Sequence, residues 1–556
     1  MAVDAVGLPS IADSGDDTLL KKDFGTIGLL FTAVGSIIGS GWLFGALKAS
    51  QIAGPAAIFS WLIGTVMFVL IGLTYAEVGV MFPRSGGLAR YPHYAFGSFT
   101  SFTMGWITWL ATVSVAPVEV QAVTQYATNY LPWLQVQANG TPVLTNPGLG
   151  VAVALMAVFT VINFLGVRWF ARINNVLVWW KLAVIALVVI VFFVVSFDST
   201  HFTGFGGFTP FGLQGVFEAI PTASIAFAFF GFRQGIELAG ETSNPGRNIP
   251  LTVVGSVVLC GIIYIALQFV FIGAVPSSSI TAGGWASLGN HIIPGTSATA
   301  SGSFGPLAAT ATVLGIGWLA VLLYVDAIIS PGDTGLIYTG VSARLSYGMG
   351  RNRNAPAALA KVNSNGVPWL SLLLAFVIGC LFFLPFPGWQ QLVEFVTNTT
   401  VLSFGMGPLV LIAMRKQLPD TARPFRLKGA WVIAFLALLS SNLIVYWTGW
   451  DTNWKMFAAI LLGFVLLVAQ QTFAKRTTPA LDLRHGWWLL VWFAGLAVIS
   501  YLGPYPAVSK GAGNLGVTAF GVGVGLCAVL TAVVMTLAYT CRLPGEVVRR
   551  RMAAAD

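Results

Sequence analysis

Charged residues are scarce in this chain of 556 residues. Asp, Glu, Lys and Arg together make up 8% of the sequence, whereas 56% of the residues are hydrophobic. Soluble globular domains carry about 25% charged residues. The composition therefore excludes an ordinary soluble protein and indicates a polytopic membrane protein.

Cysteine and histidine are also rare, with four of each. The chain has no HExxH or GxSxG motif, which would indicate a metalloprotease or a serine hydrolase. No repeated ring of like residues suggests a channel filter. The cysteines lie inside long apolar runs or at the end of the last one, where neither a disulfide framework nor a metal site is expected: Cys260, Cys380, Cys527 and Cys541. We therefore expect neither an enzyme nor a resident cofactor or metal.

Long hydrophobic runs fill most of the chain. A helix that spans about 30 Å of hydrocarbon needs about 20 apolar residues, and fourteen segments meet this need. A core of twelve helices with two added ones describes the same count. We predict an all-α polytopic membrane protein with spans near residues 27–47, 53–81, 98–128, 149–167, 173–197, 213–239, 250–275, 306–341, 368–386, 391–415, 430–448, 454–474, 486–503 and 514–540.

Lysine and arginine are distributed unevenly between the predicted loops. If the amino terminus is cytoplasmic, 23 of the 28 fall on the cytoplasmic side and only Lys48, Lys455 and Lys510 fall outside. The remaining two, Lys181 and Arg233, lie inside segments. Cytoplasmic loops carry the excess of positive charge, so we predict an integral protein of the plasma (inner) membrane with both termini cytoplasmic. Basic loops facing anionic lipid account for the net charge of +9 without a nucleic-acid partner.

Two apolar segments contain small residues where a membrane helix normally runs unbroken. They are Gly39, Ser40 and Gly41 in the first segment, and Gly231 and Gly235 in the sixth. Inside lipid, an interrupted helix persists only where protein or a water-filled cavity supplies partners for its backbone. The pattern indicates a substrate site within the membrane, as in secondary transporters. The alternative is that these glycines only permit close helix packing.

The interrupted segments are the first and the sixth, which are five segments apart. A repeat with an odd number of spans inverts its second copy, so segments one to five and six to ten would form an inverted pair. The amino-terminal ends of broken half-helices suit a carboxylate, and the freed carbonyls suit an ammonium group. Together these ends match the zwitterion of an amino acid.

Four stretches resemble motifs of the amino acid, polyamine and organocation (APC) transporters, in the order of that family. They are residues 35–44 (GSIIGSGWLF), 77–97 (EVGVMFPRSGGLARYPHYAFG), 229–250 (FFGFRQGIELAGETSNPGRNIP) and 344–356 (RLSYGMGRNRNAP), the last of which continues to KVNSNGVPW.

The resemblance covers about residues 25–415 and implies the LeuT-like fold of five plus five inverted helices. In that fold the substrate binds between helices one and six and is flanked by helices three and eight. Residues 1–24 would be a cytoplasmic tail, 416–540 four additional transmembrane helices, and 541–556 a basic cytoplasmic tail.

The resemblance also implies a substrate site at the two breaks. The backbone of Ser40 and Gly41 would receive the substrate carboxylate. Carbonyls near Ile37 and around residues 227–230 would receive the amine, and Phe227 stands where family members often have an aromatic lid. The expected substrate-binding residues are Ile37, Gly39, Ser40, Gly41, Phe227, Phe230, Gly231 and Arg233.

Lys181 lies well inside the fifth apolar segment, in the stretch INNVLVWWKLAVI. A lysine there costs about 2.5 to 3.5 kcal/mol on insertion scales and is usually functional. The stretch resembles the fifth helix of proton-coupled family members, in which a lysine amine occupies the place where sodium-driven relatives bind sodium. We expect Lys181 to carry the coupling proton. The alternative is that its side chain snorkels toward the cytoplasmic headgroups near Arg172.

Arg233 follows Gly231 and Phe232, where relatives often carry an acidic residue. A cation facing the cavity suits a second carboxylate on the substrate, as in aspartate or glutamate, through a bidentate pair. On this ground the chain resembles the aspartate and proton symporter branch. The alternative is that Glu237 and Glu241, four and eight positions on, neutralise Arg233 within its own helix.

Glu119 lies in the third segment, and an intramembrane carboxylate is a functional candidate. It could share the coupling proton or pair with Lys181 or Arg233. Equally, it could lie near the outer end of its segment. Asp326 and Asp333 in the eighth segment are similar carboxylates, and the sequence leaves open whether they face the cavity.

These observations predict a secondary active transporter that imports amino acids by proton symport and alternating access. Its partners would be the amino acid, which the Arg233 argument suggests is acidic, the protons that supply the energy, and membrane lipid. The alternative function is an exchanger of amino acids or amines with the same fold.

Overall fold

The computed structural model is built almost entirely of helices. It describes residues 25–83, 87–138, 141–165, 170–291, 302–351, 355–363, 366–473, 481–508 and 514–553. Within these residues the only sheet consists of two short antiparallel strands, β1 (Gln135–Ala138) and β2 (Thr141–Leu144), in which Val136 pairs with Val143. The predicted all-α class is confirmed.

The helices of the first two thirds of the chain include both predicted breaks. They are α1 (Thr26–Ile37), α2 (Gly41–Ala53), α3 (Ala57–Met81), α4 (Gly87–Phe96), α5 (Ser98–Val113), α6 (Val115–Ala127), α7 (Asn146–Leu165), α8 (Phe170–Ser196), α9 (Gly212–Thr222), α10 (Gln234–Glu237), α11 (Pro245–Ala274), α12 (Ser277–Gly283), α13 (Leu288–His291), α14 (Pro306–Val313) and α15 (Gly317–Arg351).

The remaining helices and the short 3₁₀ turns complete the bundle. They are α16 (Trp369–Leu381), α17 (Trp389–Phe404), α18 (Met406–Gln417), α19 (Ala430–Thr448), α20 (Trp450–Phe473), α21 (Leu483–Gly486), α22 (Trp488–Leu502), α23 (Phe520–Cys541) and α24 (Gly545–Ala553), with 3₁₀ turns at Gly54–Ala56, Ser199–Phe202, Phe227–Arg233 (η4), Ala239–Glu241, Trp285–Ser287 and Ala357–Ala360.

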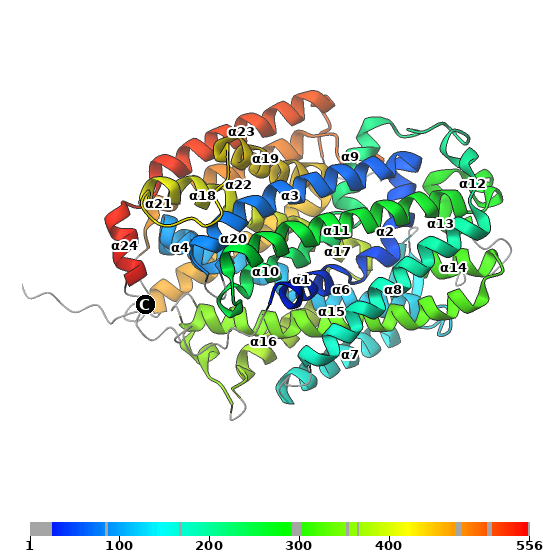
Figure 1. Cartoon of the computed structure of the whole chain (residues 1–556), viewed down its shortest axis with the longest axis horizontal. Coiled ribbons are helices and arrows are strands. Elements are labelled where there is room, and N and C mark those ends of the chain that lie inside the picture. The colour runs from blue at the N-terminus through cyan, green and yellow to red at the C-terminus, as the bar shows by residue number, and fades with distance from the viewer. Residues whose placement is uncertain are drawn as a thin grey trace, which may run out of the picture.

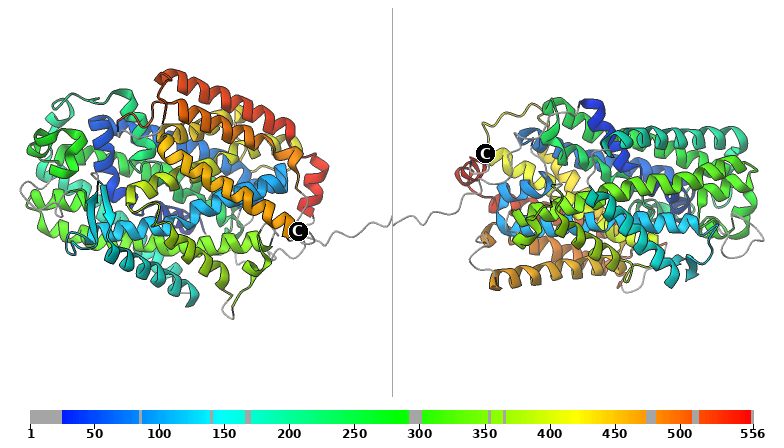
Figure 2. Two further views of the ribbon diagram at one scale, coloured as in Figure 1. Left: turned by 180° about the vertical axis from the view of Figure 1, so that it is seen from behind. Right: turned by 90° about the horizontal axis from the view of Figure 1, so that it is seen from below.

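The long helices run roughly along the longest axis of the molecule, with α12, α13 and α14 near one end and α24 at the other (Figure 1). Seen from behind, the carboxyl-terminal helices, in orange and red, lie together on one flank, away from α7 in cyan (Figure 2). The apolar core is therefore shared by helices from the whole length of the chain.

Within the described residues, eleven helical stretches are long and apolar enough to cross a membrane, and twelve if the bent pair in the sixth segment counts as one span. Each of the fourteen predicted segments contains a helix. The totals differ because Gly41–Met81 is counted as one stretch and because Trp369–Leu381, with 13 residues, is too short to qualify.

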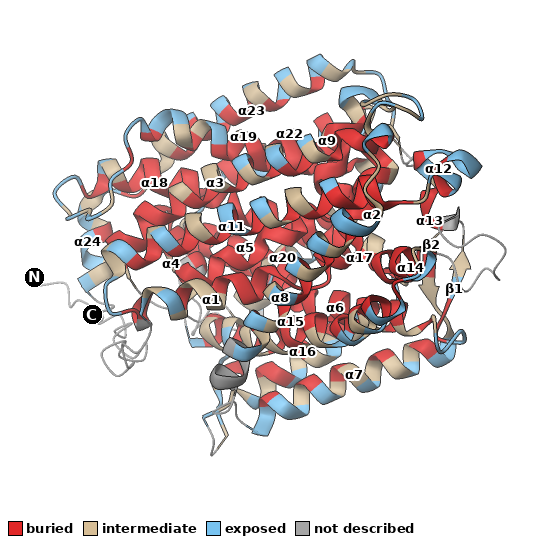
Figure 3. Ribbon diagram, turned by 45° about the vertical axis from the view of Figure 1, so that its right-hand side comes forward, coloured by how far each residue is buried: buried red, intermediate tan, exposed pale blue. Residues whose placement is uncertain are grey.

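The outer helices expose apolar side chains rather than polar ones. In Trp389–Gln417 the most apolar stretch of 18 residues is completely buried. In α7 and in α23 only 28% of the corresponding stretch is buried. Figure 3 shows this contrast between the buried middle and the exposed flanks of α7 and α23. Large exposed apolar faces mark surfaces that contact a membrane or another protein. Together with the many apolar helices of membrane length, they identify an integral membrane protein.

The first break lies where the small residues predicted it. Helix α1 ends at Ile37 and α2 begins at Gly41. Ile38 leaves the helical region with φ −85° and ψ 80°, and the N–H of Leu43 restarts the helix by bonding the Ser40 carbonyl at 3.1 Å. The N–H groups of Ile38 and Gly39 still bond the carbonyls of Val34 and Ile37. The N–H of Ser40 has no such backbone partner and can therefore bond a side chain of another helix.

The second break begins earlier than the glycines suggested. Helix α9 ends at Thr222, the chain bends by 48°, and η4 follows as a tight 3₁₀ stretch. Ser224 makes the turn with φ +63°, in the left-handed region. The turn therefore lies before Gly231 and Gly235, where it was predicted. Gly231 permits close packing rather than forming the turn, as described below.

The eighth segment also differs from its prediction. Helix α14 ends at Val313 and a separate long helix, α15, runs from Gly317 to Arg351. Gly315 has φ +76°, which few other residues adopt readily, and it separates the two helices. The predicted span 306–341 therefore started too early and ended too early.

Candidate functional site between the two broken helices

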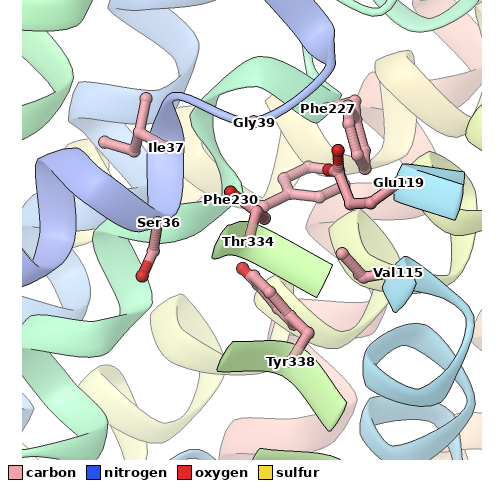
Figure 4. A pocket seen from close by; sticks show the side chains of 9 residues that line it. All are labelled: Ser36, Ile37, Gly39, Val115, Glu119, Phe227, Phe230, Thr334 and Tyr338. Carbon is pink, nitrogen blue, oxygen red and sulfur yellow. The ribbon is translucent and has the colours of Figure 1, made fainter. Parts of the chain in front are cut away.

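A small cavity lies between the two breaks (Figure 4). Its volume is about 10 Å³, which is enough for about one water molecule. The cavity is therefore too small to hold a molecule of the size of an amino acid. The lining residues are Ser36, Ile37, Gly39, Val115, Glu119, Phe227, Phe230, Thr334 and Tyr338.

Helical spacing explains how two of the walls form. Val115 and Glu119 are four residues apart on α6, and Thr334 and Tyr338 are four apart on α15, so each pair shares one helix face. The first break and η4 supply the other walls. Helices one, three, six and eight of the predicted order therefore meet at the cavity.

Glu119 places its carboxylate at the first break. The side chain is completely buried, and the Ser40 N–H donates a hydrogen bond of 2.9 Å to Oε2. The other oxygen, Oε1, has no hydrogen-bond partner among the described residues. A Cβ on Gly39 would lie 2.7 Å from this oxygen, so glycine keeps room for the carboxylate.

The Ser40 amide was expected to receive the substrate carboxylate, and in this structure it receives the carboxylate of Glu119 instead. The Ser40 hydroxyl is held as well, because Trp389 Nε1 donates to it at 3.1 Å. Gly41 packs against the second break, where a Cβ would come within 3.2 Å of the Ala228 Cβ and 3.3 Å of the Phe227 ring.

Gly231 allows the two broken segments to touch. A Cβ at this position would lie 2.2 Å from the backbone nitrogen of Ile37 and 2.3 Å from the carbonyl carbon of Ser36. The Ile37 carbonyl, expected to bind an amine, accepts a hydrogen bond of 3.4 Å from the Tyr264 hydroxyl. Phe230 lines the cavity beside Phe227, with the two ring centroids 5.7 Å apart.

Lys181 is buried completely and binds two other helices. Its Nζ donates to the Gly35 carbonyl in α1 at 3.0 Å and to Asp333 Oδ2 in α15 at 2.7 Å. Both side chains of this ion pair have no exposed surface. The snorkelling alternative is therefore wrong, because the amine points into the bundle. Arg172, near which it was expected to snorkel, has a side chain outside the described residues.

Arg233 lies beside the cavity and not in its wall. Its Nη2 donates to the Thr112 hydroxyl at 2.9 Å, and the guanidinium stacks over the ring of Tyr338, 5.0 Å from the centroid. Among the described residues it forms no ion pair, so Glu237 does not neutralise it by direct contact. The Glu241 side chain lies outside the described residues. Tyr338 thus separates the cation from the cavity.

The two aspartates of α15 have different surroundings. Asp326 accepts hydrogen bonds from Trp180 Nε1 at 2.9 Å and from the Ser330 hydroxyl at 2.8 and 2.9 Å. Asp333 Oδ2 binds Lys181, and its Oδ1 has no partner among the described residues. Asp326 is satisfied within its own neighbourhood, whereas Asp333 sits next to the cavity residue Thr334.

Sequence reasoning missed four cavity residues, Ser36, Val115, Thr334 and Tyr338. One of them carried a signal that could have been read, because Val115 lies one turn before Glu119 on the same helix. Across the part of the chain that the structure describes, no group of three or more His, Cys, Asp or Glu residues is arranged to hold a metal ion.

Several known proteins with similar sequences are named as transporters or permeases of amino acids. The chain is 38% identical over 491 residues to the glutamate/serine transporter AimA of Bacillus subtilis strain 168, covering 87% of this chain and 88% of that protein. It is 33% identical over 488 residues to the aspartate-proton symporter of the same organism, with 87% and 91% covered. The branched-chain amino acid permease BcaP of B. subtilis is 25% identical over 475 residues, with 82% and 94% covered.

A family model also matches most of the chain. The amino acid permease family aligns with residues 24–467, which include both broken helices, the cavity and the Lys181–Asp333 pair. The match agrees with the four motifs and with the all-helical membrane fold. The chain therefore belongs to the amino acid permease family of the APC superfamily, and it is an integral membrane transporter of amino acids.

Proposed function

We propose that this protein imports amino acids together with protons and that its main substrate is acidic, aspartate or glutamate. The observation that carries the symport proposal is the hydrogen bond between Glu119 and the Ser40 amide. A substrate carboxylate that takes this amide must displace Glu119. Two carboxylates confined to one small buried site repel each other strongly, so substrate binding favours the protonated form of Glu119.

Lys181 is the second coupling residue in this proposal. It joins the inner half of the first helix, through the Gly35 carbonyl, to α15, through Asp333. A change of protonation at this junction alters how tightly the broken helix is held. The relative that is named an aspartate-proton symporter supports the same coupling ion.

The acidic substrate is supported by Arg233 and by the names of two relatives. A guanidinium binds a carboxylate through two parallel hydrogen bonds, and Arg233 keeps its Nε without a partner among the described residues. In the proposal, Tyr338 swings away as the cavity widens, and the guanidinium then meets the side-chain carboxylate of the substrate. The backbone of Gly39 and Gly41 and the rings of Phe227 and Phe230 enclose the rest of the amino acid.

The membrane orientation belongs to the same proposal. Both termini lie in the cytoplasm, residues 25–415 form the transport core, and residues 416–540 form the additional helices. The proposal is supported by the 23 basic residues assigned to the cytoplasmic side. Cysteines introduced near each end of the chain and labelled in intact cells test the orientation directly.

Uptake into liposomes tests the function. Purified protein is reconstituted, and entry of labelled aspartate, leucine and arginine is measured with and without an inward proton gradient. We expect aspartate to accumulate only with the gradient. Gradient-driven uptake of leucine or arginine in its place contradicts the acidic substrate, and uptake only into preloaded vesicles indicates the exchanger.

Two substitutions separate the parts of the proposal. Arg233→Ala should impair aspartate uptake far more than uptake of neutral amino acids, and Arg233→Lys should restore little because lysine lacks the bidentate geometry. Equal loss for all substrates would assign Arg233 to helix structure. Lys181→Ala should abolish gradient-driven accumulation.

A further inference from the structure

The Lys181–Asp333 ion pair is the most isolated pair of opposite charges in the described part of the membrane core. Its two side chains have no exposed surface, and they come from helices 152 positions apart in sequence. Such a pair stabilises a protein weakly, because both ions lose their hydration. Its place beside the cavity calls for another role.

We propose that the coupling proton binds to Asp333 and that Lys181 remains a cation throughout the transport cycle. Glu119 stays ionised while it holds the Ser40 amide and is protonated only when a substrate carboxylate displaces it. This inference rests on the proposed proton symport and deepens it. It assigns the proton to a carboxylate that sequence reasoning had left without a role. Lys181 becomes a positioning residue that senses the charge of Asp333.

The charges around the pair favour this assignment. The groups that interact electrostatically with the pair are Glu119 on α6 and Asp326 on α15, both carboxylates. Loss of a proton from Lys181 would leave Asp333 as an unpaired buried anion among them. Gain of a proton on Asp333 leaves one cation facing those carboxylates, which is the less costly arrangement in a low dielectric.

Among the residues whose side chains the structure describes, Lys181 is the titratable group that bonds the Asp333 carboxylate. Helix α1 contributes the backbone carbonyl of Gly35, which accepts from Lys181. Arg233 on η4 is directed at Thr112 and Tyr338. The balance is therefore set by Lys181 and the two neighbouring carboxylates.

The carboxylate also has a free position for the proton. Asp333 Oδ2 is bonded to Lys181, whereas Oδ1 is buried and has no partner in the described structure. A hydronium ion gives its proton to Oδ1, so that one O–H bond of the hydronium breaks as the O–H bond at Oδ1 forms. The proton passes back to water when the site opens to the other side. Asp326 differs, because both of its oxygens have partners: Trp180 Nε1 donates to Oδ1, and the Ser330 hydroxyl lies within hydrogen-bond distance of both oxygens.

Protonation of Asp333 would also release a mechanical link. The Lys181 amine links Asp333 of α15 to the carbonyl of Gly35 in α1. Gly35 lies two residues before α1 ends at Ile37. Neutral Asp333 attracts the amine less than the anion does, so α15 loosens its hold on α1. Proton binding thereby frees the inner half of the broken helix, which alternating access requires to move.

Proteoliposomes containing Asp333→Asn test the inference, with Asp326→Asn as a matched control on the same helix. Three quantities are measured: aspartate accumulation driven by an inward proton gradient, proton entry reported by a trapped pH dye, and exchange of labelled for unlabelled aspartate at equal pH on both sides. We expect Asp333→Asn to lose accumulation and proton entry while exchange persists, and Asp326→Asn to retain all three.

The outcomes distinguish two failures. If the wild-type protein does not accumulate aspartate with the gradient, the proposed symport is overturned. If the wild type does and Asp333→Asn does too, only the assignment of the proton to Asp333 is overturned. Should Asp333→Asn not fold, Asp333→Glu replaces it. We expect that variant to remain coupled with a displaced pH profile of uptake, and an unchanged profile overturns the assignment.

Discussion

Two glutamates of this protein are equally buried and differ in how their oxygens are satisfied. Glu77, near the end of α3, receives Arg415 Nε at 2.9 Å, Arg415 Nη2 at 2.7 Å and the Leu427 N–H at 2.7 Å. Glu119, at the first break, accepts from the Ser40 N–H, and its Oε1 has no hydrogen-bond partner among the described residues. A saturated carboxylate fixes a structure, whereas one with a free oxygen can accept a proton or yield to a ligand.

The Glu77 cluster joins segments that are far apart in sequence. Arg415 lies in α18 and also donates to the Leu427 carbonyl at 2.7 Å, and Arg423 approaches Glu77 Oε1 at 3.5 Å. The cluster therefore ties α3 to the end of α18 and to the loop that leads into α19. Its contacts anchor the additional helices to the core, and no cavity adjoins it among those described.

The largest effect expected from this contrast is on folding. Glu77→Ala leaves Arg415 largely buried without its partner, and breaking a buried pair in this way costs about 3–5 kcal/mol. The melting temperature in detergent should fall steeply, and less protein should reach the membrane. Glu77→Gln, which keeps an acceptor for the Leu427 N–H, should fall less. A melting temperature equal to that of the wild type would refute the structural role.

Gly231→Ala should have the next largest effect on stability, because Gly231 packs directly against the backbone of the first break. The new methyl group would meet the Ile37 backbone nitrogen at 2.2 Å, and backbone cannot move aside cheaply. Overpacking of this kind costs about 1–3 kcal/mol, and transport should be lost with it. Gly235→Ala is the control, since its nearest neighbour is the Thr252 side chain at 2.8 Å. Equal effects of the two variants would count against the contact between the breaks.

Glu119→Gln should change transport more than stability. The amide oxygen of Gln can still accept from Ser40, so the free energy of unfolding should change by less than about 1 kcal/mol, the worth of one typical hydrogen bond. Gln cannot take up a proton, so the dependence of uptake on the proton gradient should disappear. Thermal unfolding and gradient-driven uptake are measured on the same preparation. If Glu119→Gln lost much stability and kept normal proton coupling, Glu119 would have a structural role like that proposed for Glu77, and its proposed role in coupling would be wrong.

The smallest effect on stability is expected from a substitution of Asp482, which lies outside the membrane spans. It accepts from the Ser98 N–H at 2.9 Å at the start of α5 and pairs with Arg551 of α24 at 3.1 Å. Burial by itself would raise the pKa of Asp482, but the Ser98 N–H and the Arg551 charge outweigh it and hold the pKa below its ordinary value.

The sign of the pH effect follows from that shift. A depressed pKa contributes stability above the unfolded value of about 3.9 and loses it as the pH falls through the folded value. Asp482→Asn should therefore cost about 0.3–1 kcal/mol at pH 7, and the difference from the wild type should vanish on acidification below about pH 4. Melting temperatures of both proteins across this range provide the measurement. A difference that grows on acidification would exclude the ionised carboxylate as its source.

The two breaks illustrate how far sequence reasoning reached. The first was located correctly because three small residues in a row weaken a helix wherever they stand. The second was displaced, because the turn is made by Ser224 and its neighbours, whereas Gly231 accommodates the backbone of another helix. A glycine in a sequence does not reveal whether it serves a turn or a close approach.

The sequence by itself determined that this is an all-helical membrane protein of the amino acid permease family with two interrupted helices. These properties follow from local composition, spacing and motifs. Only the tertiary structure decided that Lys181 pairs with Asp333 and that Glu119 occupies the Ser40 amide, across 152 and 79 positions. The physical reason is that hydrophobicity acts residue by residue, whereas a buried charge finds its partner only when helices distant in sequence pack together.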